Sequence, residues 1–248
     1  MASRVRSDPP QSLPLPCVRW RYPTGVKDVS MSQLVVPDAG FEPWRTFVHY
    51  DGQEHLSGEY WSSTMTGMVV YESQLELKRA RLADFDPDVI RIHAQPFQIL
   101  SRIAGRVRHH VPDFLLVKAN GLPLVVNVKP AHRLEDEKVR FTFDWVGELL
   151  ARYGWPMEVW SGESRVRTEN LRFLASYRRP DIVDASDVER AFREVRDGET
   201  VASAEHRIGG GLPGHVARPP LMRLLWTGRL RTDLDVQLGG QSPLWRNA

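Results

Sequence analysis

The chain has 248 residues, 42% of them hydrophobic, and a formal net charge of +2 at pH 7. This composition predicts a globular protein with one sizeable core and room for a smaller second one. The single cysteine, Cys17, excludes an internal disulfide framework. The sequence also has no apolar stretch of membrane-spanning length and no signal-peptide pattern, so we expect a cytoplasmic protein with no membrane partner.

Residues 1–40 contain six prolines and show no sustained hydrophobic periodicity. This pattern predicts an extended N-terminal arm that can become ordered on a partner. The patterns that follow predict an α/β domain over residues 41–179, and a change of character near Pro180 indicates a smaller domain over 180–248.

The segment 69–85 is the first predicted helix, with Tyr71, Leu75, Leu82 and Phe85 at helical spacing. Glu72 and Glu76 lie four residues apart on a neighbouring face, and either is a candidate metal ligand. The stretch Ser73-Gln74-Leu75-Glu76 is also a capping box, in which Glu76 would accept a hydrogen bond from an amide at the helix start.

Residues 111–117 and 122–128 are two apolar, β-branched runs that predict an antiparallel hairpin. A two-residue turn at Asn120-Gly121 would place Asp113 opposite Val128. A three-residue loop ending in a left-handed Gly121 would instead pair Asp113 with Asn127. Only the second register puts Asp113, Asn127 and Lys129 on one face of the sheet.

A carboxylate beside an ammonium at a strand end can hold a divalent cation and orient an attacking water, as phosphodiester cleavage requires. The alternative for Asp113 and Lys129 is an ordinary cross-strand ion pair, which stabilises a surface only slightly.

A helix from about 134 to 153, ended by Gly154, and a strand over 157–160 predict a strand-helix-strand crossover covering one side of the sheet. Together with strands over 97–103 and 107–117, this crossover predicts a mixed sheet flanked by helices.

Charge is unevenly distributed along this domain. Between Arg91 and Lys129 six basic residues accompany a single acid, Asp113, which makes the segment formally +5. A positive strip around a lone carboxylate fits a phosphate backbone as substrate, whereas the alternative is a solvated charged face. The candidate DNA-contacting residues are Arg106, Arg108, His109 and His110.

The C-terminal region predicts a small winged-helix-like domain. Ser186 with Glu189 forms a second capping box, Thr200 can cap the next helix, and a third helix near 221–226 precedes a short hairpin over 229–234. From residue 180 onward nine arginines face ten acids, a formal charge of −1. This charge favours protein docking over reading of a DNA groove, the alternative being a helical cap that only stabilises the first domain.

Several motifs in one order resemble the TnsA endonuclease subunit of heteromeric cut-and-paste transposases. They are Ser73-Gln74-Leu75-Glu76-Leu77, Phe85 to Val89, Gln95-Pro96-Phe97, His110-Val111-Pro112-Asp113-Phe114-Leu115, Val126-Asn127-Val128-Lys129-Pro130 and Leu134-Glu135-Asp136-Glu137. The match covers about 70 residues. It implies a restriction-endonuclease-like fold with cleavage of DNA at the 5′ ends of a mobile element.

The resemblance assigns the catalytic residues to Glu76, Asp113 and Lys129, and so favours Glu76 over Glu72. It implies Mg²⁺, replaceable by Mn²⁺, held by Glu76, Asp113 and the Val128 carbonyl oxygen, with Lys129 orienting water. Asn127 and Gln95 would support the site, although Gln95 could simply end a strand. The implied partners are double-stranded DNA at transposon ends, a TnsB-like transposase and a TnsC-like AAA+ ATPase.

Asn127 departs from the wider nuclease pattern, which has Asp or Glu two residues before the lysine. An amide offers an oxygen but no charge, which predicts weaker metal binding, although the TnsA branch accepts an amide there. Two other functions stay open: a restriction or junction-resolving nuclease on the same fold, and a catalytically silent adaptor that assembles a transposition complex.

Overall fold

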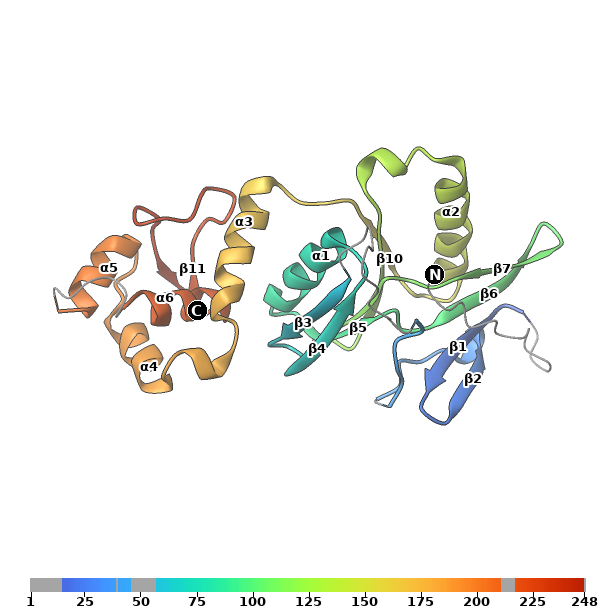
Figure 1. Ribbon diagram of the computed structural model, residues 1–248, viewed down its shortest axis with the longest axis horizontal. Helices are drawn as coiled ribbons and strands as arrows, with labels where there is room; N and C mark the ends of the chain where they lie inside the picture. The colour runs from blue at the N-terminus through green and yellow to red at the C-terminus, as the bar shows by residue number, and fades with distance from the viewer. Residues whose placement is uncertain (1–14, 39, 46–56, 211–216, 248) are drawn as a thin grey trace. The chain divides into compact units, whose positions relative to one another are not determined.

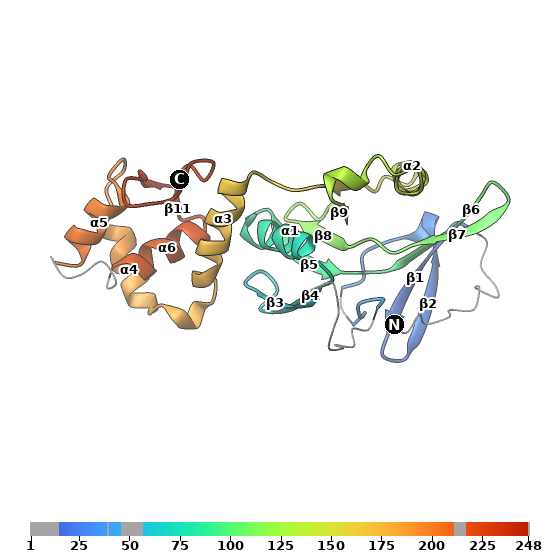
Figure 2. The same cartoon turned by 45° about the horizontal axis from the view of Figure 1, so that its top comes forward.

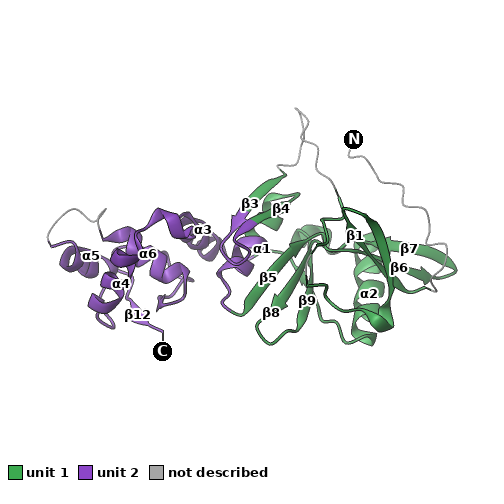
Figure 3. Ribbon diagram, turned by 90° about the horizontal axis from the view of Figure 1, so that it is seen from below, with its two compact units in different colours: residues 1–60, 68–79, 88–162 green, residues 61–67, 80–87, 163–248 purple. Residues whose placement is uncertain are grey.

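The computed structural model describes residues 15–38, 40–45, 57–210 and 217–247, and these form a mixed α/β structure. They divide into two compact units (Figure 3). Unit 1 comprises the described residues up to Tyr60, Met68–Arg79 and Asp88–Gly162, and unit 2 comprises Trp61–Gly67, Ala80–Pro87 and the described residues from Glu163 onward. The boundary expected at 179/180 therefore lies earlier along the chain, near Gly162.

The first sheet of unit 1 has the strand order β2-β1-β6-β7, with each neighbouring pair antiparallel. Its strands are β1 (Cys17–Tyr22), β2 (Gly25–Ser30), β6 (Gln98–Ile103) and β7 (Arg106–His110). A 3-10 helix, η1 (Met31–Gln33), follows β2.

The prediction of an extended arm is wrong for the described part of residues 1–40; residues 1–14 lie outside it. Val18 and Trp20 of β1 are at most 1% exposed and belong to the core of unit 1. Pro23 sits in the turn between β1 and β2, where Tyr22 pairs with Gly25, so it interrupts no ladder of hydrogen bonds.

The second sheet has the order β10-β9-β8-β5, in which β9 and β10 are parallel and the other pairs antiparallel. Its strands are β5 (Val89–Ala94), β8 (Phe114–Lys118), β9 (Pro123–Val128) and β10 (Met157–Trp160). Helix α2 (Glu137–Arg152), preceded by the 3-10 helix η2 (Ala131–Arg133), connects the parallel strands, which confirms the predicted crossover.

One face of α2 packs against the second sheet. Trp145, Val146, Leu149 and Leu150 form a buried cluster that also contains Leu115 and Val125. Figures 1 and 2 show that α2 also lies near β6 and β7. Leu115 and Val125 are directly opposite each other in the β8–β9 ladder, so their side chains share one face, and their cluster with α2 residues shows that this face meets the helix.

The hairpin register is the one that requires a three-residue loop. Phe114 pairs with Val126, the Lys118 amide donates to the Leu122 carbonyl at 2.9 Å, and Gly121 has φ of +80°. The predicted single strand over 107–117, in contrast, is two strands. It is divided at Val111-Pro112-Asp113, because β7 pairs with β6 in one sheet and β8 pairs with β9 in the other.

Helix α1 (Gln74–Phe85) begins later than predicted. Val69 and Tyr71 belong to β4 (Gly67–Tyr71), which pairs with β3 (Gly58–Ser62). The Ser73 hydroxyl accepts a hydrogen bond from the Glu76 amide at 3.1 Å and so begins the helix at this point.

Besides the second half of α1, the described residues of unit 2 include four complete α-helices and one short strand pair. These are α3 (Arg165–Leu174), α4 (Ala185–Glu194), α5 (Val201–Ile208), α6 (Arg218–Trp226), β11 (Leu230–Arg231) and β12 (Trp245–Arg246), with 3-10 helices η3 (Ala175–Tyr177) and η4 (Pro180–Ile182). Helix α3 belongs here because Leu171 and Leu174 pack in the same buried cluster as Leu221 and Leu225 of α6.

Two local predictions for unit 2 are wrong and one is confirmed. Asp184, and not Ser186, caps α4, since its side chain accepts from the Ser186 amide at 2.7 Å. No hairpin forms over 229–234, because β11 pairs with the distant β12. Thr200 caps α5 as predicted, accepting from the Ser203 amide at 3.2 Å.

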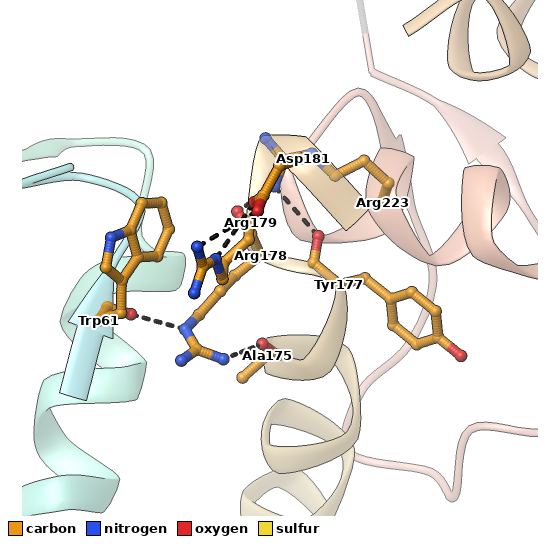
Figure 4. A network of polar contacts seen from close by, with 7 residues as sticks. All are labelled: Trp61, Ala175, Tyr177, Arg178, Arg179, Asp181 and Arg223. Carbon is orange, nitrogen blue, oxygen red and sulfur yellow. Dashed lines mark hydrogen bonds and ion pairs between the residues drawn. The ribbon is translucent and has the colours of Figure 1, made fainter. Parts of the chain in front are cut away.

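Arginine side chains tie the segment after α3 to its neighbours in unit 2 (Figure 4). Arg223 of α6 donates to the carbonyl oxygens of Tyr177 and Arg178. Arg178 in turn donates to the Trp61 carbonyl at 2.6 Å. Within the described residues, no helix is both long and apolar enough to cross a membrane.

Candidate functional site

Asp113 lies where β7 ends and β8 begins, and its main chain and its side chain are both held by neighbouring strands. Its amide donates to the Val126 carbonyl at 3.1 Å, and its carbonyl accepts from the Gln95 amide at 2.8 Å. Its Oδ2 accepts from the Val128 amide at 2.6 Å. The β8–β9 register ends at the Phe114–Val126 pair, and the predicted pairing of Asp113 with Asn127, one residue beyond it, stays a prediction.

The main chain of Val128 faces Asp113. In a strand, the N–H and C=O of one residue point to the same side. Because the Val128 N–H binds the Asp113 carboxylate, the Val128 carbonyl oxygen also points to the β8 side. The next amide, of Lys129, points to the other side and donates to the Trp160 carbonyl at 3.0 Å.

Glu76 is 8% exposed and forms the predicted capping box in a modified form. Its Oε1 accepts from the Ser73 hydroxyl at 2.9 Å, and its Oε2 accepts from the Glu72 amide at 2.8 Å, one residue before the amide of a standard capping box. Glu72 itself forms an ion pair with Arg45, with 2.5 Å between Oε2 and Nη1. Of the two carboxylates, Glu76 is therefore the one turned inward.

Glu76, Asp113 and Lys129 form one electrostatic cluster. Burial, and after it the nearby Glu76 charge, raise the pKa of Asp113 to about 7, although the Val128 amide and the Lys129 charge act in the opposite direction. Burial also raises the pKa of Glu76. Two buried carboxylates that repel each other are unfavourable unless a cation joins them.

Arg45 is a member of this cluster that the sequence did not indicate. Its positive charge lowers the pKa of both Asp113 and Glu76, and its amide donates to Gln95 Oε1 at 3.2 Å. It lies outside any helix or strand, on a segment without periodicity, so no local pattern could have connected it with residues 30 to 70 positions away.

Gln95 has a strained main chain and a buried side chain. Its φ is +45°, an uncommon value for a residue other than glycine and more so before a proline, and the side chain is 2% exposed. Gln95 does follow the end of β5 at Ala94, so it ends a strand and lies beside Asp113 as well.

Asn127 is fully buried, and its carbonyl oxygen is engaged by the protein. His110 Nε2 lies 2.6 Å from Asn127 Oδ1. The His110 ring also packs edge-to-face on Phe143 and Trp145 of α2. Burial lowers the pKa of His110 to about 4, so this imidazole is neutral at pH 7 and donates from Nε2.

The other three predicted DNA-contacting residues, Arg106, Arg108 and His109, are exposed on β7 in the other sheet. Arg108 and His109 line a cavity of about 540 Å³ shared with Lys138 and Phe141 of α2. The Arg108 guanidinium lies 5.5 Å from the centre of the Phe141 ring. His110 differs from these three because its ring is packed inside unit 1.

The donor set suits a hard cation. Among the described residues no group of three or more His, Cys, Asp and Glu side chains could hold a metal ion. A cation at Asp113 would therefore have two carboxylates, the Val128 carbonyl and solvent as ligands, and such oxygen ligands are typical of Mg²⁺. Burial raises the pKa of both Asp113 and Glu76, and a bound cation would favour the charged forms that burial disfavours.

Comparisons with known proteins do not assign a family. No protein-family model matches the chain, and no curated protein matches it in sequence.

Proposed function

We propose that the protein is a TnsA-like, metal-dependent DNA endonuclease, the subunit that cleaves the 5′ ends of a mobile element within a heteromeric transposase. The observation that carries the proposal is the hydrogen bond between the Val128 amide and the Asp113 carboxylate at the end of the β8–β9 hairpin, which brings Asp113 next to the Asn127-Val128-Lys129 segment. The influence of Glu76 and Lys129 on the pKa of Asp113 supports the same grouping.

The arrangement of unit 1 is consistent with a restriction-endonuclease-like fold. The hairpin β8–β9 occupies the centre of a mixed four-stranded sheet, with Asp113 and Lys129 at one end of it. Helix α2 covers the face that carries Leu115 and Val125, and Glu76 comes from the first turn of α1.

When bound, Mg²⁺ would stabilise charge on the scissile phosphate and lower the pKa of a water molecule. Glu76, Asp113 and the Val128 carbonyl would hold the cation. Lys129 would orient the attacking water or neutralise charge that develops on the phosphate. Arg45, fixed by Glu72, adds a second positive charge to a site that binds an anionic substrate.

For unit 2 we propose a winged-helix-like module that docks a protein, the TnsC-like ATPase being the partner that the resemblance implies. In a DNA-reading module of this kind the recognition helix exposes its side chains to a groove. Here most of α6 is buried: Leu221, Met222, Leu224, Leu225 and Trp226 are at most 3% exposed. Its two arginines are also engaged, Arg218 by Glu205 and Arg223 by main-chain carbonyls.

A cleavage assay tests the enzymatic proposal. The purified chain, with a TnsB-like transposase and DNA carrying element ends, is expected to cut the 5′ strands in Mg²⁺ or Mn²⁺. D113A and K129A should abolish the cut, while D144A, which removes an exposed carboxylate of α2, should not. Unchanged cutting by D113A or K129A would contradict the assignment of roles.

The same assay separates the alternatives. Sequence-selective cutting by the chain alone would favour a restriction or junction-resolving nuclease. The silent-adaptor alternative is favoured by one observation, the engagement of the Asn127 oxygen by His110. Transposition at the original level with D113A in place of the natural chain would establish the adaptor.

A further inference from the structure

Two buried amide side chains lie on either side of Asp113. The Gln95 amide, directly after β5, donates to the Asp113 carbonyl. On the other side, Asn127 of β9 precedes Val128, whose amide binds the Asp113 carboxylate. The two residues therefore come from the strands that flank β8, and both lie next to the residue whose carboxylate would hold the cation.

The oxygen of each amide is already engaged by the protein. Gln95 Oε1 accepts from the Arg45 amide at 3.2 Å, and Asn127 Oδ1 accepts from His110 Nε2 at 2.6 Å. The Arg45 contact fixes the Gln95 amide, because a main-chain N–H can bind only the amide oxygen, and the Nε2–H tautomer of His110 fixes the Asn127 amide in the same way.

The nitrogen of each amide has no partner. Gln95 Nε2 and Asn127 Nδ2 are buried without a hydrogen-bond acceptor among the described residues, on side chains that are 2% and 0% exposed. A buried donor without an acceptor is costly, and proteins retain such groups mainly at functional sites or where a ligand or water completes them. Finding two of them on either side of one carboxylate calls for a common explanation.

We propose that Gln95 and Asn127 are hydrogen-bond donors for a phosphate oxygen of the DNA substrate, and not ligands of the metal. Arg45 and His110 are the positioning residues: because each binds an amide oxygen, the NH₂ group of the same amide points away from it. The inference rests on the proposed nuclease function, and it changes the role of Asn127 from a weak substitute for a carboxylate to a donor. Two neutral donors beside a lysine suit an oxygen that carries negative charge.

The test measures DNA and metal binding separately and requires no cleavage. The probe is a fluorescent duplex oligonucleotide carrying an element end, titrated by anisotropy in Ca²⁺. Metal binding is read from the rise in melting temperature with Ca²⁺ in the absence of DNA. We expect N127D and Q95E, which keep the size and the bound oxygen but lose the donor, to weaken DNA binding about 10-fold or more.

Neither substitution should weaken Ca²⁺ binding, whereas D113A should abolish it. The matched control is Q98A: Gln98 is a glutamine of similar burial, 7% exposed, but its unpartnered atom is the acceptor Oε1 and not a donor. Q98A should leave DNA affinity within about 2-fold of the original.

Three results would overturn the proposal. Loss of Ca²⁺ binding in both N127A and Q95A would make the two residues metal ligands. Unchanged DNA affinity of N127D and Q95E, with wild-type chain that binds DNA, would mean that an internal water completes the amides. Unchanged DNA affinity of H110F, with Asn127 in place, would show that His110 does not orient the amide. Failure of the nuclease proposal looks different: the wild-type chain would then neither bind element ends preferentially nor cut them.

Discussion

The raised pKa of Asp113 predicts that D113N stabilises unit 1 at neutral pH. The carboxyl has a pKa of about 7 in the folded chain against an ordinary value of 3.8. A difference of this size corresponds to at most roughly 4 kcal/mol between the two protonation states. An asparagine has nearly the same shape and keeps an oxygen for the Val128 amide, but carries no charge to be desolvated.

Proton linkage gives the direction in which the stability of unit 1 changes with pH. The folded state binds this proton more tightly than the unfolded state, so the favourable contribution is complete below pH 3.8 and is lost as the pH rises to about 7. D113N removes this dependence. Its advantage over the natural chain should therefore be small near pH 4 and reach a plateau above pH 7, and we expect a plateau of about 2–4 kcal/mol.

Hydrogen exchange of peptides from β8 and β9 is the suitable assay, because it reports the stability of unit 1 without contribution from unit 2. Measurements at pH 5, 6, 7 and 8 in a chelator give the pH profile. Added Mg²⁺ should stabilise the natural chain by about 1.4 kcal/mol when its concentration is ten times Kd, and should not stabilise D113N. A D113N variant that is no more stable than the natural chain at pH 8 in chelator would refute the reasoning.

Three further substitutions test the local structure that positions the site. S73A removes the hydroxyl that caps α1 and binds Glu76, and should lower the unfolding free energy of unit 1 by about 1 kcal/mol in denaturant titration. G121A should lower the unfolding free energy of unit 1 by about 1–2 kcal/mol. Its added Cβ meets no atom within 4 Å, so the only cost is the strained φ of +80°. G121N should lower the unfolding free energy less, and equal losses for the two variants would contradict this account. R218M leaves the Glu205 carboxylate of unit 2, whose side chain is 8% exposed, without its bidentate partner; because the Arg218 side chain is itself 50% exposed, the unfolding free energy of that unit should fall by only about 1–2 kcal/mol. The double variant R218M/E205Q should recover most of the loss, and no recovery would show that packing of Arg218 is responsible.

The β8–β9 hairpin could be predicted because the residues that set its register are local. Gly121 fixes the loop, and alternation along β8 and β9 then decides which residues share a face. Gly154 after α2 and Thr200 before α5 are similar cases, in which one residue marks the end or the beginning of a helix.

Long-range pairing could not be predicted in the same way. Strand β1 pairs with β6, about 80 residues later, and Trp20 is buried only because that sheet exists. A proline-rich segment without visible periodicity was therefore predicted to be an arm, whereas its described part forms an inner strand, β1, and an edge strand, β2. The division at Val111-Pro112-Asp113 was missed for a related reason, since the apolar run continues across it while its pairing partner changes.

The features that lower the stability of unit 1 lie together. Gln95 carries backbone strain, Asp113 and Glu76 carry buried charge, and the NH₂ groups of Gln95 and Asn127 lack acceptors among the described residues. Each costs free energy in the folded chain, and strain or unsatisfied polar groups persist where the surrounding structure holds them for function. A divalent cation would relieve the repulsion of the carboxylates, and a phosphate oxygen would complete the amides. The two carboxylates thus lack a positive charge, and the two NH₂ groups beside them lack a negatively charged oxygen. A phosphodiester bound to a metal ion would supply both groups.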